Sequence, residues 1–117
     1  MKENVIKQKS YGFALQIIRL YKVLVNDKKE FVLSKQILRS GTSIGANVEE
    51  ALAASSKADF INKLNVAAKE NRETSYWLRL LKDSGFITEE GFSSLHQECL
   101  EMQKIFSSIL MTSKTNS

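Results

Sequence analysis

Residues 56–81 read SKADFINKLNVAAKENRETSYWLRLL, and the spacing of their apolar side chains predicts one long α-helix. Positions on one face recur at intervals of four and three, the period of a helix that packs against other helices. Ser56 and Asp59 resemble a capping box that starts the helix, and Gly85 can take the left-handed conformation that ends it. The stripe consists of Phe60, Leu64, Ala67, Asn71, Thr74, Leu78 and Leu81. A helix of this length is typical of helical bundles.

Apolar residues at helical spacing predict a second helix before this one, at about residues 31–53. Gly41 and Gly45 lie four apart on its apolar side. Because glycine inside a helix costs roughly 1 kcal/mol relative to alanine, two of them predict that another backbone approaches closely there. A local break of the helix at residues 40–43 is the alternative interpretation.

The segment at about residues 10–25 carries two adjacent apolar stripes. Its apolar face is therefore wider than a single packing seam requires, and we expect this helix to contact more than its own bundle. The stripes are Phe13, Ile17, Leu20 and Leu24, and Ala14, Ile18, Tyr21 and Val25.

The fourth helix is expected to follow Thr88, which supplies an N-cap. The carboxylates of Glu89 and Glu90 suit the positive end of its dipole. The polar tail at residues 112–117 is expected to fray. The seam of this helix consists of Phe92, Leu95, Cys99, Met102, Phe106 and Ile109.

The composition bounds the fold class. The chain has 117 residues, no proline and a single cysteine, Cys99, whose place in an apolar stripe predicts a buried thiol in a reducing compartment. The N-terminus is too polar for a signal peptide, and no apolar run approaches the ~20 residues of a membrane-spanning helix, so we expect a cytoplasmic protein with no membrane contact. The prediction is an all-α, antiparallel up-down-up-down four-helix bundle, a single domain over residues 1–117 with its core at about 10–111.

Residues that carry catalysis are sparse. Di-iron bundles need Glu-x-x-His pairs on two helices, whereas this chain has one histidine, His96, preceded three residues earlier by Ser93. Cys99 lies one turn from His96 but belongs to the core stripe, so the two are not expected to act as nucleophile and base. Residues 40–45, SGTSIG, lack the lysine of a P-loop. We expect no enzymatic activity, no metal and no cofactor.

Polar side chains recur along one face of each central helix. They form either a ligand site or a hydrogen-bond network that fixes the register of the bundle, and we favour the network because half-buried polar groups in bundles more often specify packing. An enzyme site would require Glu50, Glu70 and Glu73 to converge on a cavity. The predicted network comprises Arg39, Ser43, Asn47, Glu50, Glu70 and Glu73, with Gln36, Asn71 and Thr74 at the same spacings.

Trp77 and Tyr76 lie next to Arg79, an arrangement that can stack on nucleic-acid bases. Trp77 also flanks the apolar stripe of its helix, and aromatic residues at helical spacing usually belong to a core or a subunit interface. We therefore expect Trp77 to pack in the core.

Three stretches resemble one known family: residues 36–51, QILRSGTSIGANVEEA; residues 57–60, KADF; and residues 70–78, ENRETSYWL. The sequence is similar to the four-helix bundle family named for proteins encoded in intervening sequences of large-subunit ribosomal RNA genes. The likeness extends from about Tyr11 to Leu110. Its most specific motif is Ser-Ile-x-x-Asn-Val-x-Glu, which begins at Ser43.

The resemblance carries implications for assembly and function. Members of this family form antiparallel four-helix bundles, and some assemble as ring-shaped pentamers. The accessory variability determinant of diversity-generating retroelements is similar to them, and it binds a reverse transcriptase and nucleic acid. The resemblance therefore implies a homo-oligomer, a pentamer, with an accessory role in binding nucleic acid or protein.

The net charge of +4 is spread unevenly, because residues 1–25 are basic and residues 88–117 are net negative. We expect a non-catalytic oligomeric accessory protein that binds structured RNA or DNA, or a ribonucleoprotein partner, through basic side chains. The alternative is a homo-oligomeric protein–protein adaptor that does not touch nucleic acid. The predicted nucleic-acid-binding residues are Lys7, Lys9, Arg19, Lys22, Lys63 and Arg72.

Overall fold

The structure, a computed structural model, describes residues 1–115 of the chain. Each of its helices packs against two others, in the cyclic order α1, α2, α3, α4 and back to α1. The sequence prediction of an all-α four-helix bundle is therefore confirmed. The helices are α1 (Lys2–Asn26), α2 (Leu33–Leu52), α3 (Lys57–Asp83) and α4 (Glu89–Thr115).

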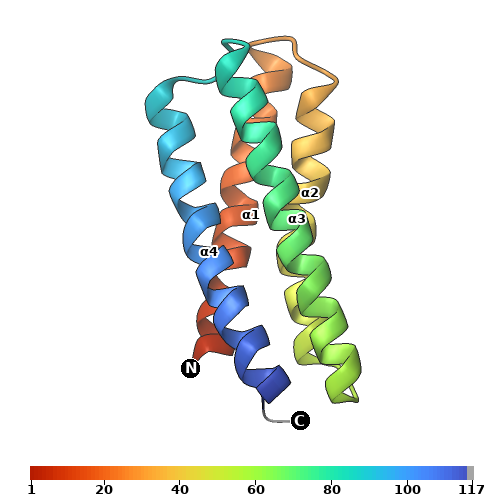
Figure 1. The fold of residues 1–117 in the computed structure, drawn as a ribbon. Helices are drawn as coiled ribbons and strands as arrows, with labels where there is room; N and C mark the ends of the chain where they lie inside the picture. Colours follow the sequence, from red (N-terminus) through yellow and green to blue (C-terminus); the bar gives the residue numbers. More distant parts are fainter. Residues whose placement is uncertain (116–117) are drawn as a thin grey trace.

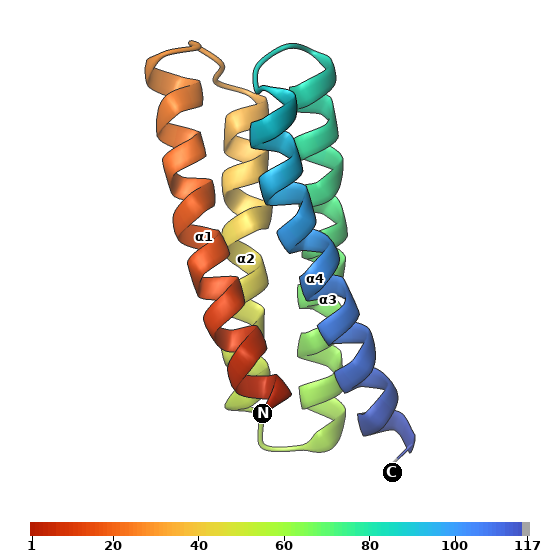
Figure 2. The same ribbon diagram turned by 90° about the vertical axis from the view of Figure 1, so that its left-hand side faces the viewer.

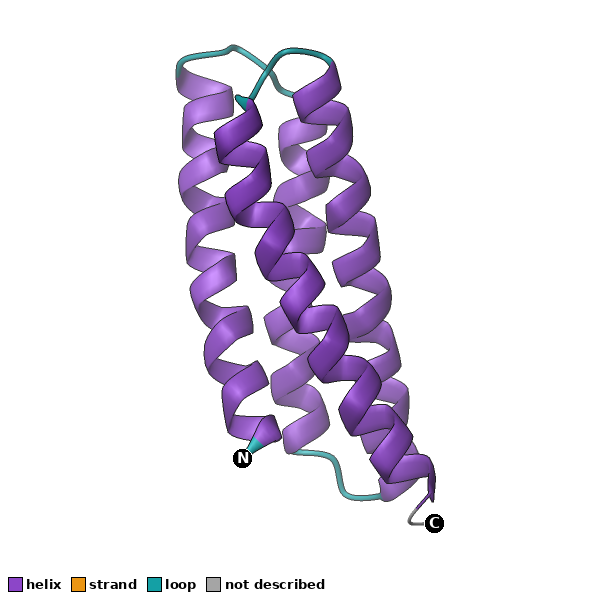
Figure 3. Ribbon diagram, turned by 60° about the vertical axis from the view of Figure 1, so that its left-hand side comes forward, coloured by secondary structure: helices purple, strands orange, loops and turns teal. Residues whose placement is uncertain are grey.

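The four helices lie side by side along the long axis of the molecule, and consecutive helices run in opposite directions (Figure 1). Seen from the side in Figure 2, α1 and α2 form one pair, and α3 and α4 the other. The connections are short and lie at the two ends of the bundle, as the loops in Figure 3 show. The bundle measures 48 × 22 × 19 Å, so long helix faces make up most of its surface.

The apolar stripes predicted for the four helices meet in one core. Burial of a large apolar side chain contributes about 1.5–3 kcal/mol, so this core supplies most of the driving force for folding. Cys99 belongs to it, with 2% of its surface exposed. The largest fully buried side chains include Phe13, Ile17, Leu24, Ile44, Leu78, Met102 and Phe106.

Both ends of the chain are more helical than the sequence analysis expected. α1 begins at Lys2 rather than near residue 10, because Ile6 is fully buried and extends the core stripe by two turns below Phe13. α4 continues through Thr115, where fraying from residue 112 was expected. Residues 116–117 of that expected tail lie outside the described part of the chain.

The predicted helix boundaries at the centre of the chain are confirmed by their hydrogen bonds. Ser56 Oγ accepts from the backbone N–H of Asp59 at 3.1 Å, which is the first half of a capping box. Gly85 adopts φ +85° after α3, and Thr88 Oγ1 accepts from the N–H of Gly91 at 3.0 Å. These contacts satisfy amides that have no partner inside their own helices.

α2 runs without interruption through residues 40–43, so the alternative of a local break is wrong. A Cβ atom at Gly45 would lie 3.4 Å from the backbone oxygen of Ser10, which confirms the predicted close approach of a backbone. At Gly41 the neighbour is instead the side chain of Ile17, 2.9 Å from the same hypothetical atom. The two glycines therefore let α1 and α2 pack closely.

Candidate functional site

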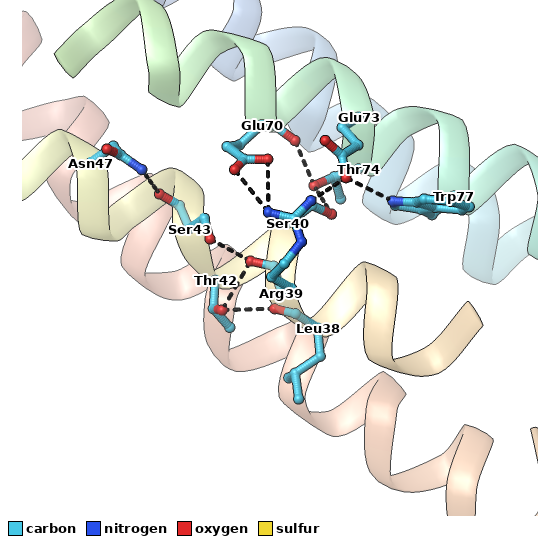
Figure 4. A network of polar contacts seen from close by, with 10 residues as sticks. All are labelled: Leu38, Arg39, Ser40, Thr42, Ser43, Asn47, Glu70, Glu73, Thr74 and Trp77. Atoms are coloured by element: carbon cyan, nitrogen blue, oxygen red, sulfur yellow. Dashed lines mark hydrogen bonds and ion pairs between the residues drawn. The ribbon is translucent and has the colours of Figure 1, made fainter. Parts of the chain in front are cut away.

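A charged cluster joins α2 to α3 on the outer side of the bundle. Arg39 Nη1 donates to both carboxylate oxygens of Glu70, at 3.0 and 3.3 Å, and Nη2 donates to Glu73. Trp77 Nε1 also donates to Glu73, at 3.3 Å. Figure 4 shows the Arg39 side chain of α2 reaching across to these carboxylates of α3. One guanidinium thus satisfies two carboxylates at once.

The position of Glu73 changes its acidity. Partial burial alone would raise the pKa of this carboxyl, but hydrogen bonds from Trp77 and Arg39, together with the charge of Arg39, lower the pKa below its ordinary value. Hydrogen bonding to Glu70 raises the pKa of Arg39. Arg39 and Glu73 are therefore both charged at neutral pH.

The remaining members of the predicted polar network do not extend this cluster. Ser43 Oγ donates to the backbone oxygen of Arg39 at 2.6 Å, and Asn47 Nδ2 donates to the backbone oxygen of Ser43 at 2.9 Å, so both side chains bond within α2 (Figure 4). Glu50 is exposed and lines the groove between α1 and α2. Glu50 thus lies apart from Glu70 and Glu73, and the three carboxylates do not converge on one cavity.

Two buried polar pairs link neighbouring helices through the core. The Thr74 hydroxyl lies 2.8 Å from the Ser40 hydroxyl of α2, and both residues are fully buried. Asn71 Nδ2 donates to the backbone oxygen of Cys99, at 2.8 Å, and to Gln103 Oε1 of α4, at 3.2 Å. These pairs have the register-fixing geometry that the network interpretation predicts for Asn71 and Thr74. Sequence reasoning missed Ser40 and Gln103.

The Cys99 thiol is buried and unreactive. Burial, and to a smaller extent the charge of Glu98, raises the pKa of the thiol to about 12. Since the thiolate is the reactive form, Cys99 has almost none of the nucleophile at neutral pH. His96 stacks on Phe92, with ring centroids 4.8 Å apart, and forms no hydrogen bond with Cys99.

Four of the predicted nucleic-acid-binding residues lie on α1. Lys9 points toward α4, where its Nζ atom is 2.7 Å from Glu101 Oε2. The hydrogen bond and charge of Lys9 lower the pKa of Glu101. Lys7, Arg19 and Lys22 are exposed and form no ion pair with any residue in 1–115. Lys9 is thus neutralised within the chain, and the other three are available to an anion.

The other two predicted residues lie on α3, away from the basic residues of α1. Lys63 is half-buried, and Arg72 is exposed beside the junction of α3 and α4. α1 and α3 are diagonal in the bundle and do not contact each other. The six residues therefore do not form one patch on a single chain.

Trp77 packs against the core, as expected, but it is only half-buried. Tyr76 is 47% exposed, meets the Trp77 ring edge-on at a centroid distance of 5.1 Å, and has the Arg79 guanidinium 5.7 Å from its own centroid. Tyr76 and Arg79 are the more accessible members of this group.

Residues 1–115 contain neither a cluster of metal-ligating side chains nor a helix suited to a membrane. Among these residues, no group of three or more His, Cys, Asp or Glu side chains is arranged to hold a metal ion. Within the same range, none of the helices combines the length and hydropathy that crossing a membrane requires.

Comparisons with known proteins agree with the fold and the motifs. Among curated proteins, none matches the chain. A solved crystal structure of a protein of unknown function from the S23 ribosomal protein family of Bacteroides thetaiotaomicron VPI-5482 is 58% identical in sequence and superposes with a TM-score of 0.94. That similarity covers 95% of this chain and 99% of the other. The family model described as 23S rRNA-intervening sequence protein matches residues 2–108. The chain therefore belongs to the 23S rRNA-intervening sequence protein family.

Proposed function

We propose that this protein is a non-catalytic, homo-oligomeric accessory protein that binds structured nucleic acid or a ribonucleoprotein partner. The observation that carries the proposal is the set of exposed basic side chains on α1 with no acidic partner in residues 1–115. Arg19 is the clearest member, because it points away from the core on an outer face of the helix. The family's description, which refers to intervening sequences of 23S rRNA, supports an RNA ligand.

Self-association strengthens this proposal. A single chain has a net charge of only +4, whereas a ring of five copies, the assembly implied by the family resemblance, carries +20. Because affinity for nucleic acid grows with the number of phosphates neutralised, repeated copies of a modest basic face bind better than one. The reduced, buried thiol of Cys99 supports a cytoplasmic setting for such a complex.

The test is binding of the purified protein to a structured RNA and to duplex DNA over a salt series. We expect affinity that falls steeply as salt rises, because counterions are released on binding. Arg19→Gln should lower affinity for all sequences and reduce the slope of log K against log salt by about 1 for each copy that contacts the ligand. Lys9→Gln is the matched control on the same helix. Its ammonium is already paired with Glu101, so it should have a smaller effect.

The result that contradicts the proposal is absence of binding at low salt, or equal effects of the two substitutions. The second candidate function, a protein–protein adaptor, would then be favoured by the apolar side chains exposed between α1 and α2. Tyr11 is 62% exposed and Leu15 40%. Partners that co-purify with the parent protein but not with Tyr11→Asp would support the adaptor.

A further inference from the structure

The outer face of α1 carries a stripe of mixed polar and apolar side chains, which shares only Ile18 with the two apolar stripes predicted for this helix. Its members recur at intervals of three and four residues, the spacing of a helix that packs against another helix. Ile18 is half-buried and the others are exposed. The stripe consists of Gln8, Tyr11, Leu15, Ile18 and Lys22. No helix of the same chain covers this stripe, since its outer members face solvent.

Beside this stripe runs a groove between α1 and α2. It consists of two adjoining hollows of about 730 and 530 Å³, which share Tyr11 and Glu49. Small side chains of α2 form its α2 wall, at Thr42, Gly45 and Ala46. Small residues let a helix approach closely, so the shape suits an incoming helix.

The two ends of the groove differ in charge. Glu49 and Glu50 line the end near the start of α1, and Lys7 lines the same hollow as Glu49. Lys22 lies one turn beyond Ile18, at the other end. None of these side chains has an ion-pair partner within residues 1–115. The groove is therefore acidic at one end, apolar in the middle and basic at the other end.

α4 carries an exposed stripe of the same spacing with the matching order of side-chain types. Glu90 lies near its start, Leu100 in its middle and Lys104 further on. Leu100 is 46% exposed. Neither Glu90 nor Lys104 forms an ion pair within the described residues. The stripe consists of Glu90, Ser93, Gln97, Leu100, Lys104, Ser107 and Met111.

Contacts between α1 and α4 fix the height of this stripe along the bundle. Lys9 pairs with Glu101, and Lys2 Nζ donates to Ser108 Oγ. Lys104 lies between these two partners on α4, so it stands level with the segment of α1 between Lys2 and Lys9. The acidic end of the groove is at the same level, because Asn4 and Lys7 line it with Glu49.

The other end of the stripe matches in the same way. α4 starts at the end of the bundle where α1 finishes (Figure 1). Since Glu90 is in the first turn of α4 and Lys22 is near the end of α1, the two residues stand at similar levels. Two copies placed side by side in the same orientation would oppose Lys104 to Glu49 and Glu50, and Glu90 to Lys22. Leu100 would then face the apolar middle of the groove.

We propose that the groove between α1 and α2 receives the outer stripe of α4 from a second copy of this chain, with both copies in the same orientation. The inference rests on the self-association in the proposed function and assigns its surface. Because the two contacting surfaces differ, each copy both offers a groove and fills one, which is a head-to-tail contact. A head-to-tail contact can repeat from copy to copy, and it closes into a ring when the rotation between successive copies divides a full turn.

The assignment divides the basic residues of α1. Lys7 and Lys22 lie at the two ends of the groove, so in the assembly they face α4 of the next copy. Arg19 lies on the neighbouring face of the helix and stays accessible, so it is the α1 residue on which nucleic-acid binding by the assembly rests. The two proposals therefore fail separately, since assembly is measured without nucleic acid and Arg19 is outside the interface.

The experiment is light scattering of the purified full chain, without nucleic acid, at low and moderate salt. The parent should have a mass that is a multiple of the 13.2 kDa chain. Lys104→Glu should lower the mass toward that of one chain, because it places like charges opposite Glu49 and Glu50. Glu49→Lys with Glu50→Lys should do the same from the groove side. All three substitutions together should restore the parent's mass.

Two further variants make the outcome decisive. Lys69→Glu makes the same charge change at an exposed position of α3 outside both surfaces, and it should leave the mass unchanged. Leu100→Asp should dissociate the oligomer through the apolar middle of the contact. Circular dichroism checks that every variant keeps the parent's helix content. A monomeric parent overturns the proposal, as does parental mass for both Lys104→Glu and Leu100→Asp, or a triple variant that stays dissociated.

Discussion

The two glycines of α2 show how much one missing side chain matters at a helix contact. Both lie on the side that faces α1, but their surroundings differ. Gly41 faces the branched Ile17 side chain, and Gly45 faces the backbone at Ser10. At Gly41 an added methyl group would have no room, whereas at Gly45 it would be at ordinary van der Waals distance.

We expect Gly41→Ala to destabilise the protein by about 1–3 kcal/mol, because overpacking forces Ile17 from its position. Gly45→Ala is the matched control. Its Cβ would have no neighbour closer than 3.4 Å, and alanine favours the helix, so the free energy of unfolding should change little or rise. Urea unfolding followed by circular dichroism measures both. Equal losses at the two positions would contradict the packing described here.

Trp77 is the only tryptophan in the chain, and its indole N–H is bonded to Glu73. We expect its fluorescence to change as Glu73 is protonated, with a midpoint below the ordinary carboxyl value of 4.5. Arg39→Gln should move the midpoint upward, since it removes a hydrogen bond and a positive charge. A fluorescence titration, run where circular dichroism shows intact helices, measures this. A midpoint that Arg39→Gln leaves unchanged would show that the cluster does not set the acidity of Glu73.

At the scale of the element, the start of α2 has an unusual cap. Glu30 accepts hydrogen bonds from three successive backbone amides, those of Val32, Leu33 and Ser34, at 3.2, 3.0 and 2.7 Å. Burial alone would raise the pKa of Glu30, but these backbone bonds lower it. A single carboxylate therefore satisfies three amides that lack partners within the helix.

Glu30→Ala should cost about 1 kcal/mol of stability, the usual effect of losing a cap. Because the folded-state pKa lies below the unfolded value, the contribution of Glu30 is present above the unfolded pKa and is lost as pH falls through the folded pKa. The gap in melting temperature between parent and variant should therefore close on acidification below about pH 4.5. Thermal melts at several pH values measure it. A constant gap would show that the charge of Glu30 is not what caps the helix.

The elements also show what local sequence can and cannot predict. The capping residues Ser56 and Thr88 follow short-range rules, and the structure has both bonds. Glu30 was missed because it lies two residues before the cap position, in a stretch that looks like an ordinary polar connection. The start of α1 was missed because the polar residues 7–10 separate Ile6 from Phe13, although Ile6 lies two helical turns before Phe13, in register with the core stripe.

At the scale of the whole molecule, buried polar pairs hold the helices in one register. The Ser40–Thr74 pair joins α2 to α3, and the Asn71–Gln103 pair joins α3 to α4. The apolar stripes alone allow a helix to slide by a turn with little loss, whereas a buried hydroxyl that loses its partner pays a desolvation penalty. The predicted face of Thr74 was right, but its partner Ser40 could be identified only once the register was known.

We expect Thr74→Val to destabilise the bundle by about 1–3 kcal/mol, because it leaves the buried Ser40 hydroxyl without its partner. Adding Ser40→Ala should recover part of that loss, so the double variant costs less than the two single variants combined. Chemical unfolding of the four proteins measures the coupling. Strict additivity would mean that the two hydroxyls do not stabilise each other.

The burial of Cys99 has a practical consequence for any study of this protein. Its thiol is the only one in the chain, and it holds its proton at neutral pH. A cysteine introduced on the outer face of any helix would therefore be the one site that a maleimide dye or spin label modifies. Distances between such labels on neighbouring copies can therefore be measured without first replacing Cys99.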